Sequence, residues 1–378
     1  MSYRVPFVDA AAHFRSMQSE LLDAMTTSLL RGNLIMRDEL KDFENSMARF
    51  VGTQYAVGVN SGTDAVHFAL RAGGIQPGDE VITVSHGCIA TVSAIVHAGA
   101  RPVLVDVAED CNMAMGRVAA AITPRTRAIV PVHLNGRSCD MARLTKIAQQ
   151  HNLVVIEDAS HALGAEFCGR QVGSFGMAGC FSLYPFKMLG ACGDGGLVVT
   201  NDRYLARQVS VLRDYGQDRQ TGEILCFGFN SRLDNIQAAL LSVKLPYVPK
   251  WILRRREIAA RYHDGLRSIP GLTLPHFSGD EYVDVYMNYC IRTSRRDELF
   301  RYLVDHSIEP LTPLSVVTPV HQHKALQLDH VSLPVTERIA KEFLYLPIHP
   351  ELTDDQIDHV IACINGFYGT DNKVASSR

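Results

Sequence analysis

The chain has 378 residues, 47% hydrophobic and 20% charged, which is the composition of an ordinary globular protein with room for a large domain and a smaller one. Its formal net charge of -3 gives no electrostatic reason to expect nucleic acid or an anionic membrane as a partner. The nine cysteines include no C-x-x-C pair, which argues against a disulfide framework and against a metal site.

The start of the chain, MSYRVPFVDAAAHF, lacks the basic residues and the long apolar run of a signal peptide. No stretch approaches the roughly 20 apolar residues that are needed to span a bilayer. The sequence therefore predicts a cytoplasmic protein with reduced thiols, without a membrane or a nucleic acid as its partner.

The first half of the chain alternates helical periodicity with short β-branched runs. Leu40, Phe43 and Met47 recur at helical spacing, and Thr63 opens a second expected helix. Strands are expected at 56–59, 80–84, 102–105, 128–132, 153–156, 179–183 and 197–200. This alternation predicts an α/β fold with a mainly parallel sheet, which would bind its ligands at the carboxyl ends of the strands. Four polar residues follow such strand ends: Asp106, His133, Glu157 and Asp158.

The second half of the chain has a different pattern. A long helix at 235–268 is expected to bend at Pro246 and Pro249. Further elements are expected at 285–292 (a strand), 295–306 (a helix) and 353–367 (a last helix). These elements predict a large domain at 1–250 and a smaller C-terminal α+β domain at 251–378, with the boundary near Trp251.

The segment 181–196, FSLYPFKMLGACGDGG, contains a lysine among aromatic and apolar side chains next to a glycine-dense loop. Partial desolvation lowers the pKa of an amine, which makes Lys187 a candidate nucleophile. A lysine in a loop can equally lie at the surface, so Lys187 needs support from other segments.

A second segment, 153–164, is an apolar strand that leads into Asp158 and His161. A carboxylate at this strand end could keep the nitrogen of a pyridine cofactor protonated, so that the ring accepts electrons from a substrate carbanion. His161 could lie beside such a ring. Asp158 could also simply cap the turn or helix that follows.

A third segment, Ser61-Gly62-Thr63, ends a short strand and opens a helix. Backbone N–H groups, the helix dipole and the Thr63 hydroxyl can converge there on a phosphate, although an ordinary helix cap has the same pattern. No nucleotide-binding G-x-G-x-x-G or G-x-x-x-x-G-K-[ST] motif is present. Together, the three segments offer a phosphate grip, an acid for a ring nitrogen and an amine, which is the set that pyridoxal phosphate (PLP) requires.

Four motifs in this order resemble the DegT/DnrJ/EryC1/StrS aminotransferases: SGTDA (61–65), EDASHALGA (157–165), FSLYPFKMLGACGDGG (181–196) and FNSRLDNIQAAL (229–240). The resemblance runs through nearly the whole chain, and the lysine-centred motif is its most specific part. It implies a fold-type I, aspartate-aminotransferase-like PLP-dependent transferase. It also implies a homodimer with the active sites at the subunit interface.

The resemblance implies pyridoxal 5′-phosphate as the cofactor and Lys187 as the catalytic residue, which would carry the cofactor as a Schiff base and move the proton during the reaction. Asp158 would pair with the ring nitrogen. His161 would lie near the ring oxygen.

The remaining cofactor contacts also follow from the resemblance. One subunit would hold the phosphate with three residues: Gly62, Thr63 and Ser182. Asn230 would reach the phosphate of the neighbouring subunit. Cys88 stands where relatives commonly carry an aromatic residue that stacks on the cofactor ring, and His86 is the nearest alternative.

The family's usual reaction moves an amino group, normally from L-glutamate, to a keto carbon of a nucleotide-linked deoxysugar, and some members aminate keto-cyclitols instead. The basic run 254–256 could receive the acceptor's diphosphate or could be a solvated helix face. Met287, Asn288 and the segment 311–321 depart from the family pattern at positions that line the acceptor pocket in relatives. The acceptor is therefore not assigned from the sequence.

Three other functions share parts of this sequence pattern. A related sugar dehydratase has histidine where this chain has Lys187. A non-catalytic PLP-binding regulator would hold the cofactor without reacting with amino donors. A cysteine desulfurase would need a mobile cysteine over the cofactor, and Cys192 is the nearest in sequence.

Overall fold

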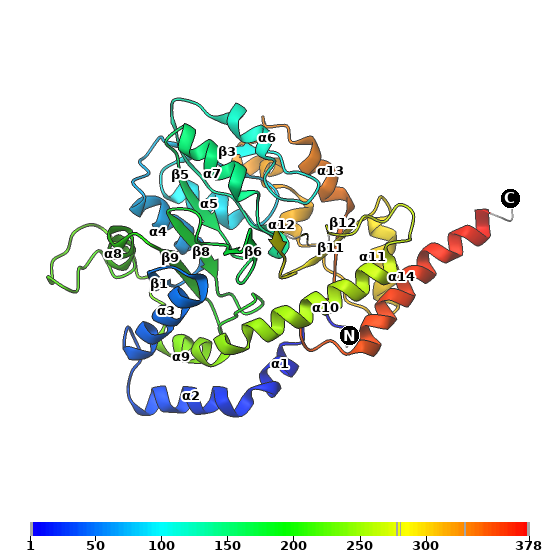
Figure 1. Cartoon of the computed structure of the whole chain (residues 1–378), viewed down its shortest axis with the longest axis horizontal. Helices are drawn as coiled ribbons and strands as arrows, with labels where there is room; N and C mark the ends of the chain where they lie inside the picture. The colour runs from blue at the N-terminus through cyan, green and yellow to red at the C-terminus, as the bar shows by residue number, and fades with distance from the viewer. Residues whose placement is uncertain (1–2, 277–278, 280, 329, 376–378) are drawn as a thin grey trace.

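The computed structural model describes residues 3–276, 279, 281–328 and 330–375, and a seven-stranded sheet forms its centre (Figure 1). The strand order is β1-β9-β8-β5-β4-β2-β3, and every expected strand of the first half is present within a few residues. Only β9 runs antiparallel to its neighbours, so the predicted mainly parallel α/β sheet is confirmed. The strands are β1 (Tyr55–Val59), β2 (Glu80–Val84), β3 (Arg101–Val105), β4 (Thr126–Ile129), β5 (Val154–Asp158), β8 (Ala178–Ser182) and β9 (Gly196–Thr200).

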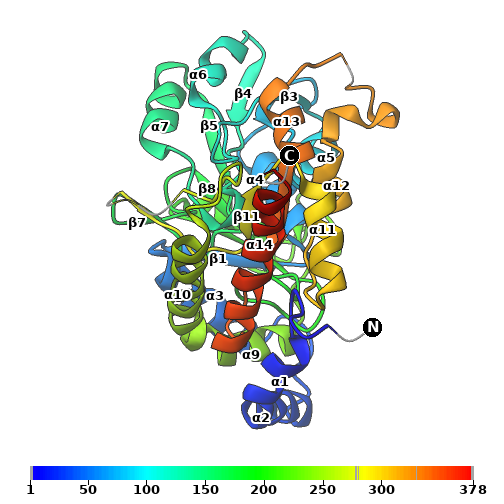
Figure 2. The ribbon, with the colours of Figure 1, turned by 90° about the vertical axis from the view of Figure 1, so that its right-hand side faces the viewer.

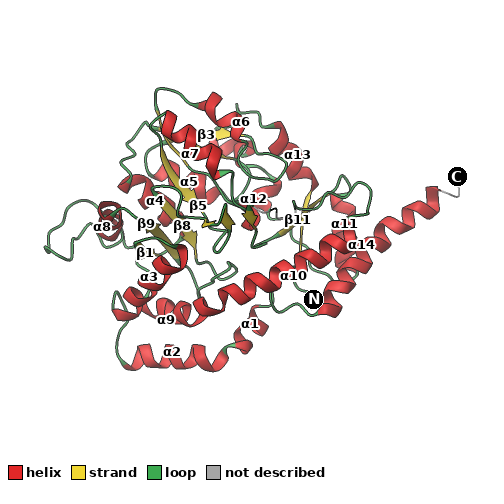
Figure 3. Ribbon diagram, in the orientation of Figure 1, coloured by secondary structure: helices red, strands yellow, loops and turns green. Residues whose placement is uncertain are grey.

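Helices cover both faces of this sheet, as Figure 3 shows. Along β9, Leu197 and Val199 pack in a core with α3 and α9, whereas Val198 packs in a core with α4 and α8. The helices of these layers are α3 (Asp38–Val51), α4 (Gly62–Ala72), α5 (Ile89–His97), α6 (Met115–Val118), α7 (Met141–Gln150), α8 (Arg203–Leu212) and α9 (Asn235–Lys244). Before them in the chain, α1 (Ala10–Ser16) and α2 (Gln18–Leu30) lie at the bottom of Figure 1, where α2 packs against α9.

The long helix is interrupted where the prolines predict. After α9, a 3-10 turn at Leu245–Tyr247 contains Pro246, and α10 (Val248–Leu266) begins with Pro249 in its first turn. Trp251 of α10 packs in the core shared with α9, and Tyr262 packs in a second core with the C-terminal elements. One helix therefore connects both cores, and the domain boundary near Trp251 stays a prediction.

The C-terminal part contains a small two-stranded sheet and faces the viewer in Figure 2, where α14 lies in front. Its elements are β11 (Tyr289–Arg292), α11 (Arg296–Asp305), α12 (Leu314–Val317), α13 (Pro334–Glu342), β12 (Phe343–Leu346) and α14 (Asp354–Ala375). The strand expected at 285–292 begins only at Tyr289, because Tyr286 has a φ of 48° in the left-handed region, which breaks an extended run. The last helix also continues beyond its expected end at residue 367.

A three-stranded sheet was not expected from the sequence. It consists of β6 (Glu166–Phe167), β7 (Arg170–Gln171) and β10 (Tyr282–Val283). Strands of two residues carry too little periodicity to be recognised in a sequence. In the described part of the chain, no helix combines the length and the apolar character that a bilayer span requires.

Candidate active site

Lys187 lies in a tight loop between β8 and β9. Leu183 donates a backbone hydrogen bond to Gly195 O (2.8 Å), and Ala191 donates one to Leu183 O (2.8 Å), which closes the loop on itself. A side chain at Gly190 would place its Cβ 2.1 Å from Pro185 O, so only glycine fits there. The glycine-rich sequence after the lysine thus folds into a compact support for Lys187.

The amine of Lys187 faces a cavity of about 900 Å³. The lysine is half-buried, and this burial lowers its pKa to about 8 although the negative charge of Asp158 acts in the opposite direction. Lys187, His161 and Cys88 all line the cavity. The predicted low-polarity environment for the amine is therefore present.

Asp158 ends β5 and is buried, with 6% of its surface exposed. Thr91 donates its hydroxyl to Asp158 Oδ2 (2.6 Å), and the Ser160 N–H donates to Oδ1 (3.1 Å). Asp158 does not line the cavity, but its charge acts on Lys187. The carboxylate is therefore held rigidly, close to the amine.

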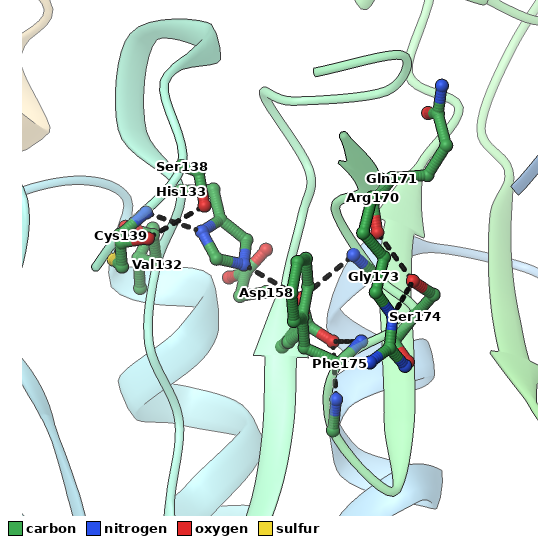
Figure 4. Close-up of polar contacts among 12 residues, drawn as sticks. Val132, His133, Ser138, Cys139, Asp158, Arg170, Gln171, Gly173, Ser174 and Phe175 are labelled. Carbon is green, nitrogen blue, oxygen red and sulfur yellow. Dashed lines mark hydrogen bonds and ion pairs between the residues drawn. The ribbon is translucent and has the colours of Figure 1, made fainter. Parts of the chain in front are cut away.

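The preceding residue, Glu157, faces a different environment, because neighbouring residues of a strand point to opposite faces. Its carboxylate accepts hydrogen bonds from the backbone N–H groups of Gly173 (2.8 Å), Phe175 (2.7 Å) and Gly176 (2.7 Å). Figure 4 shows the imidazole of His133 beside Cys139, where His133 Nδ1 accepts the Cys139 N–H (2.9 Å). This leaves the His133 Nε2–H to donate to Glu157 (3.1 Å). Glu157 and His133 are fully buried structural residues.

Asp106, which follows β3, is also a structural residue. Asp106 accepts hydrogen bonds from Val335 N, Thr336 N and Thr336 Oγ1, and thereby anchors the start of α13. Of the four strand-end residues, only Asp158 affects the charge of a side chain that lines the cavity, namely Lys187.

His161 has an imidazole whose Nδ1 is buried without a hydrogen-bond partner in the described part of the chain. Burial, and then the charge of Lys187, holds the pKa of His161 well below its usual value, so the ring is neutral. A buried, unpaired ring nitrogen at a cavity wall is a place where a ligand can supply the missing partner.

Gly62, Thr63 and Ser182 come together at the start of α4. Ser61 caps this helix by accepting the Asp64 N–H (3.1 Å), and Gly62 is the first helical residue. A Cβ at Gly62 would lie 2.8 Å from Ser182 Cβ, so the turn and the end of β8 touch. None of the three residues lines the 900 Å³ cavity. The first N–H groups of a helix lack intrahelical partners and suit an anion.

The structure does not bring Asn230 to the cavity of its own chain. Asn230 is exposed and pairs with Asp214 in an isolated β-bridge, in the loop that projects from the body after α8 (Figure 1). The same loop exposes apolar side chains, among them Phe227 with 97% of its surface accessible. Its role toward a neighbouring subunit stays a prediction.

The remaining expected site residues divide into two groups. Cys88, at the start of α5, lines the cavity, whereas His86 is buried against Phe343 and does not. Met287 and Asn288 also line the cavity, and their role in an acceptor pocket stays a prediction. Within the segment 311–321, Leu311, Pro313 and Val316 also line it.

Two contributors to the site were missed in the sequence. Thr91, which holds Asp158, follows a serine–histidine–glycine stretch without any pattern of its own. The N-terminal segment 7–14 covers part of the cavity, because Phe7 N–H donates to Glu309 (2.9 Å) and His13 pairs with Glu351 (2.5 Å). These contacts join residues about 300 positions apart, which no local pattern reveals.

Known proteins match this chain over almost its full length. The model of the DegT/DnrJ/EryC1/StrS aminotransferase family matches residues 15–365. A dTDP-3-amino-3,4,6-trideoxy-alpha-D-glucose transaminase from Streptomyces venezuelae is 42% identical over 365 residues, which cover 96% of this chain and 95% of that protein. The "Pleiotropic regulatory protein" of Geobacillus stearothermophilus is 38% identical over 370 residues, which cover 96% and 98%.

Among solved structures, S. venezuelae DesV in complex with a ketimine intermediate superposes with a TM-score of 0.93. It is 41% identical and covers 97% of this chain and 99% of its own. Aminotransferases of the matched family depend on PLP. The shared sheet, the loop around Lys187 and these near full-length matches show that the chain belongs to the DegT/DnrJ/EryC1/StrS aminotransferase family.

Proposed function

We propose that this enzyme is a PLP-dependent aminotransferase that moves an amino group from L-glutamate to a keto carbon of a nucleotide-linked deoxysugar. The observation that carries the proposal is the environment of Lys187: a half-buried amine on a large cavity, with its pKa lowered to about 8, beside the charge of Asp158. A lysine that loses its charge near neutral pH can act as a nucleophile and as a base.

The residues present fit PLP. The unpaired Nδ1 of His161, the close approach of Gly62 to Ser182 at a helix start, and the held carboxylate of Asp158 supply the polar surroundings that the ring and its phosphate need. Cys88 would contact the ring. When bound, the cofactor supplies an electron sink for the carbanion that forms at the substrate carbon.

The protein's own residues then have separate tasks. Lys187 Nζ would accept the proton from Cα of the amino donor and return a proton in the second half of the reaction. Asp158, fixed by Thr91, would keep a proton on the ring nitrogen of the cofactor. Gly62, Thr63 and Ser182 would hold the phosphate and thereby fix the position of the ring.

The choice of acceptor is supported by the relatives. The S. venezuelae relative is named for an amino group on a dTDP-linked trideoxyglucose. A keto-cyclitol stays the alternative acceptor, and a panel of nucleotide-linked 3-keto and 4-keto sugars tested beside scyllo-inosose would separate the two classes.

We also propose that the enzyme is a homodimer in which Asn230 completes the partner's phosphate site. Its position outside the cavity of its own chain and the apolar loop around it support this arrangement. Mixing the inactive variants Lys187→Ala and Asn230→Ala would test it. Random re-pairing should restore about one quarter of wild-type activity, because half of the dimers are mixed and each mixed dimer has one intact site. Activity that stays at the level of the separate variants would contradict shared sites.

The test of the main proposal is spectroscopic. The enzyme loaded with PLP should show a visible absorbance band, and L-glutamate should bleach it. Lys187→Ala should lose both the band and turnover, whereas the exposed Lys41→Ala serves as a matched control and should keep them. A wild-type band that no amino donor changes would instead support a PLP-binding regulator. The G. stearothermophilus relative is named as a regulatory protein.

The desulfurase alternative has a direct test as well. Cys192 lines the cavity, but Gln237 holds its backbone on both sides: Cys192 N–H donates to Gln237 Oε1 (2.8 Å), and Gln237 Nε2 donates to Cys192 O (3.1 Å). A residue tied in this way is poorly suited to a mobile catalytic role. Cys192→Ala should therefore keep amino transfer, and loss of turnover with cysteine as the substrate would argue for the alternative.

A further inference from the structure

One wall of the cavity carries two buried cations on consecutive helices. Lys244 ends α9, Trp251 and Arg255 lie one turn apart on α10, and all three line the cavity that contains Lys187. Their spacing of seven and four residues places them on one face of this nearly continuous helical segment. Lys244 and Arg255 are only 6% and 7% exposed.

The guanidinium of Arg255 is incompletely paired. Its Nη1 donates to the backbone carbonyls of Ile348 (2.7 Å), Tyr286 (3.2 Å) and Met287 (3.3 Å). Its Nε is buried without a partner, and neither Nη2 nor Nε makes a hydrogen bond within the described residues. Burial lowers the pKa of Arg255 to about 10, which reflects this loss of hydration.

The ammonium of Lys244 is in a similar state. It donates to Gly190 O (2.7 Å), which leaves two of its three N–H donors free for other acceptors. Burial also lowers the pKa of Lys244. No ion pair joins Lys244 or Arg255 to a carboxylate anywhere in the described ranges.

Arg254, the neighbour of Arg255 in the same helix, does have carboxylate partners. Arg254 pairs with Glu257 (3.3 Å) and Asp354 (2.8 Å) at the surface. The members of the basic run at 254–256 thus differ: Arg254 is partly exposed and paired with carboxylates, while only Arg255 lines the cavity.

The carboxylates of the cavity do not neutralise these cations. Asp9 caps α1, Glu309 accepts a backbone N–H from the N-terminal segment, and Glu351 is paired with two histidines. The charge of Glu351 reaches Arg255 without an ion pair. Buried charges in proteins are normally paired, because an uncompensated charge is expensive to remove from water. The positive charges of these two side chains therefore stay uncompensated until an anion binds in the cavity.

We propose that Lys244 and Arg255 form an oxyanion subsite that binds a negatively charged group of a substrate, and this inference rests on the proposed aminotransferase function. Two substrates could supply that group: the diphosphate of a nucleotide-linked acceptor or the side-chain carboxylate of an acidic amino donor. Both present several oxygens to fixed N–H donors, which is the geometry that guanidinium and ammonium groups recognise.

The test uses the PLP-loaded enzyme and two probes, inorganic pyrophosphate and glutarate. Trp251, the only tryptophan in the chain, lies in the same wall, so its fluorescence reports binding and calorimetry gives the affinity. We expect one probe to bind. Lys244→Met and Arg255→Met should each weaken it at least tenfold, and Arg255→Lys should recover part of the loss. Arg254→Met, a surface arginine of the same helix, is the matched control and should bind as wild type does.

A response to pyrophosphate alone assigns the subsite to the acceptor and favours a nucleotide-linked sugar over a keto-cyclitol. A response to glutarate alone assigns it to the amino donor. Both probes failing to bind the wild-type enzyme, or affinities of Lys244→Met and Arg255→Lys within twofold of wild type, would overturn the subsite even if Arg255→Met does not fold. In the same samples, bleaching of the visible band by L-glutamate reports the proposed function separately. A subsite that fails while bleaching persists leaves the aminotransferase assignment intact.

Discussion

At the carboxyl end of β5, the adjacent residues Glu157 and Asp158 lie in two regions that differ in how completely their buried polar groups are paired. On the side of Glu157, every hydrogen-bonding atom of the carboxylate is engaged by His133 and the turn at residues 173–176. We call this the scaffold region. On the side of Asp158 lie Lys187, a half-buried amine, and His161, whose ring nitrogen Nδ1 has no partner among the described residues. We call this the site region.

Buried polar groups therefore have different roles in the two regions. Complete pairing makes the scaffold region rigid, because any movement would leave a buried donor or acceptor unpaired. Incomplete pairing in the site region keeps polar atoms available, and a bound ligand would complete them. Variants in the two regions should therefore separate stability from activity.

Among the variants of these two regions that keep Lys187, the largest effect is expected for Asp158→Asn. An amide cannot keep a proton on the cofactor nitrogen, so kcat should fall roughly 1,000-fold, equivalent to about 4 kcal/mol of transition-state stabilisation. The melting temperature should change little. Steady-state kinetics with L-glutamate, together with thermal unfolding, would check both values. A variant that keeps most of its kcat would remove Asp158 from the mechanism.

The second effect concerns the amine itself. A pKa of about 8 for Lys187, compared with 10.5 for an ordinary lysine, should leave roughly 300-fold more neutral amine at pH 7. Reductive methylation of the cofactor-free enzyme, followed by mass spectrometry, should show Lys187 modified at a much lower pH than Lys41. Equal pH profiles for the two lysines would contradict a depressed pKa.

The lowered pKa of Lys187 also determines how the stability of the protein changes with pH. The unfolded chain binds the lysine proton more tightly than the folded chain does, so Lys187 destabilises the cofactor-free protein fully below pH 8. This destabilisation should disappear as the pH rises from about 8 toward 10.5. Lys187→Met should flatten that part of the stability profile.

The third prediction tests the scaffold region. Glu157→Gln replaces an acceptor oxygen with an NH₂ group that faces backbone donors, so the free energy of unfolding should fall by about 2 kcal/mol. Activity per folded molecule should be nearly unchanged. Urea unfolding of the cofactor-free protein measures the first quantity, and kcat normalised to the folded fraction measures the second. A large loss of kcat without loss of stability would show that the two regions are not separate.

The smallest effect is expected for Thr91→Val. This change removes the hydroxyl that donates to Asp158 at 2.6 Å but keeps the shape of the side chain. The expected loss in kcat is about fivefold, close to 1 kcal/mol, the contribution of one hydrogen bond. Thr91→Ser retains the hydroxyl and should restore most of the activity. Equal kinetics for the two variants would mean that Thr91 does not position the carboxylate.

Much of the site region could be predicted from the sequence, because its signals are local. The apolar run before Asp158 and the glycine-rich loop after Lys187 are continuous in the chain, and both fold as expected. The strands of the central sheet were also predictable, since their apolar runs are bounded by clear turn signals. The apolar run alone could not show whether Glu157 or Asp158 would lie on the side of Lys187, because adjacent strand residues differ only in the face they occupy.

Other features depend on contacts between distant residues and could not be predicted. The covering of the cavity by segment 7–14 requires Glu309 and Glu351, more than 290 positions away. The basic run at 254–256 shows no sequence difference between its members, yet Arg254 is partly exposed and Arg255 is buried. Burial of this kind is set by how helices pack, and periodicity gives only the face of one helix.

The central claim is that Lys187 holds the cofactor covalently, and chemical trapping tests it most directly. Borohydride reduction of the PLP-loaded enzyme, followed by proteolysis and mass spectrometry, should place the reduced phosphopyridoxyl group on the peptide that contains Lys187 and on no other. A label on a different lysine, or an enzyme that remains unlabelled after loading, would contradict the account.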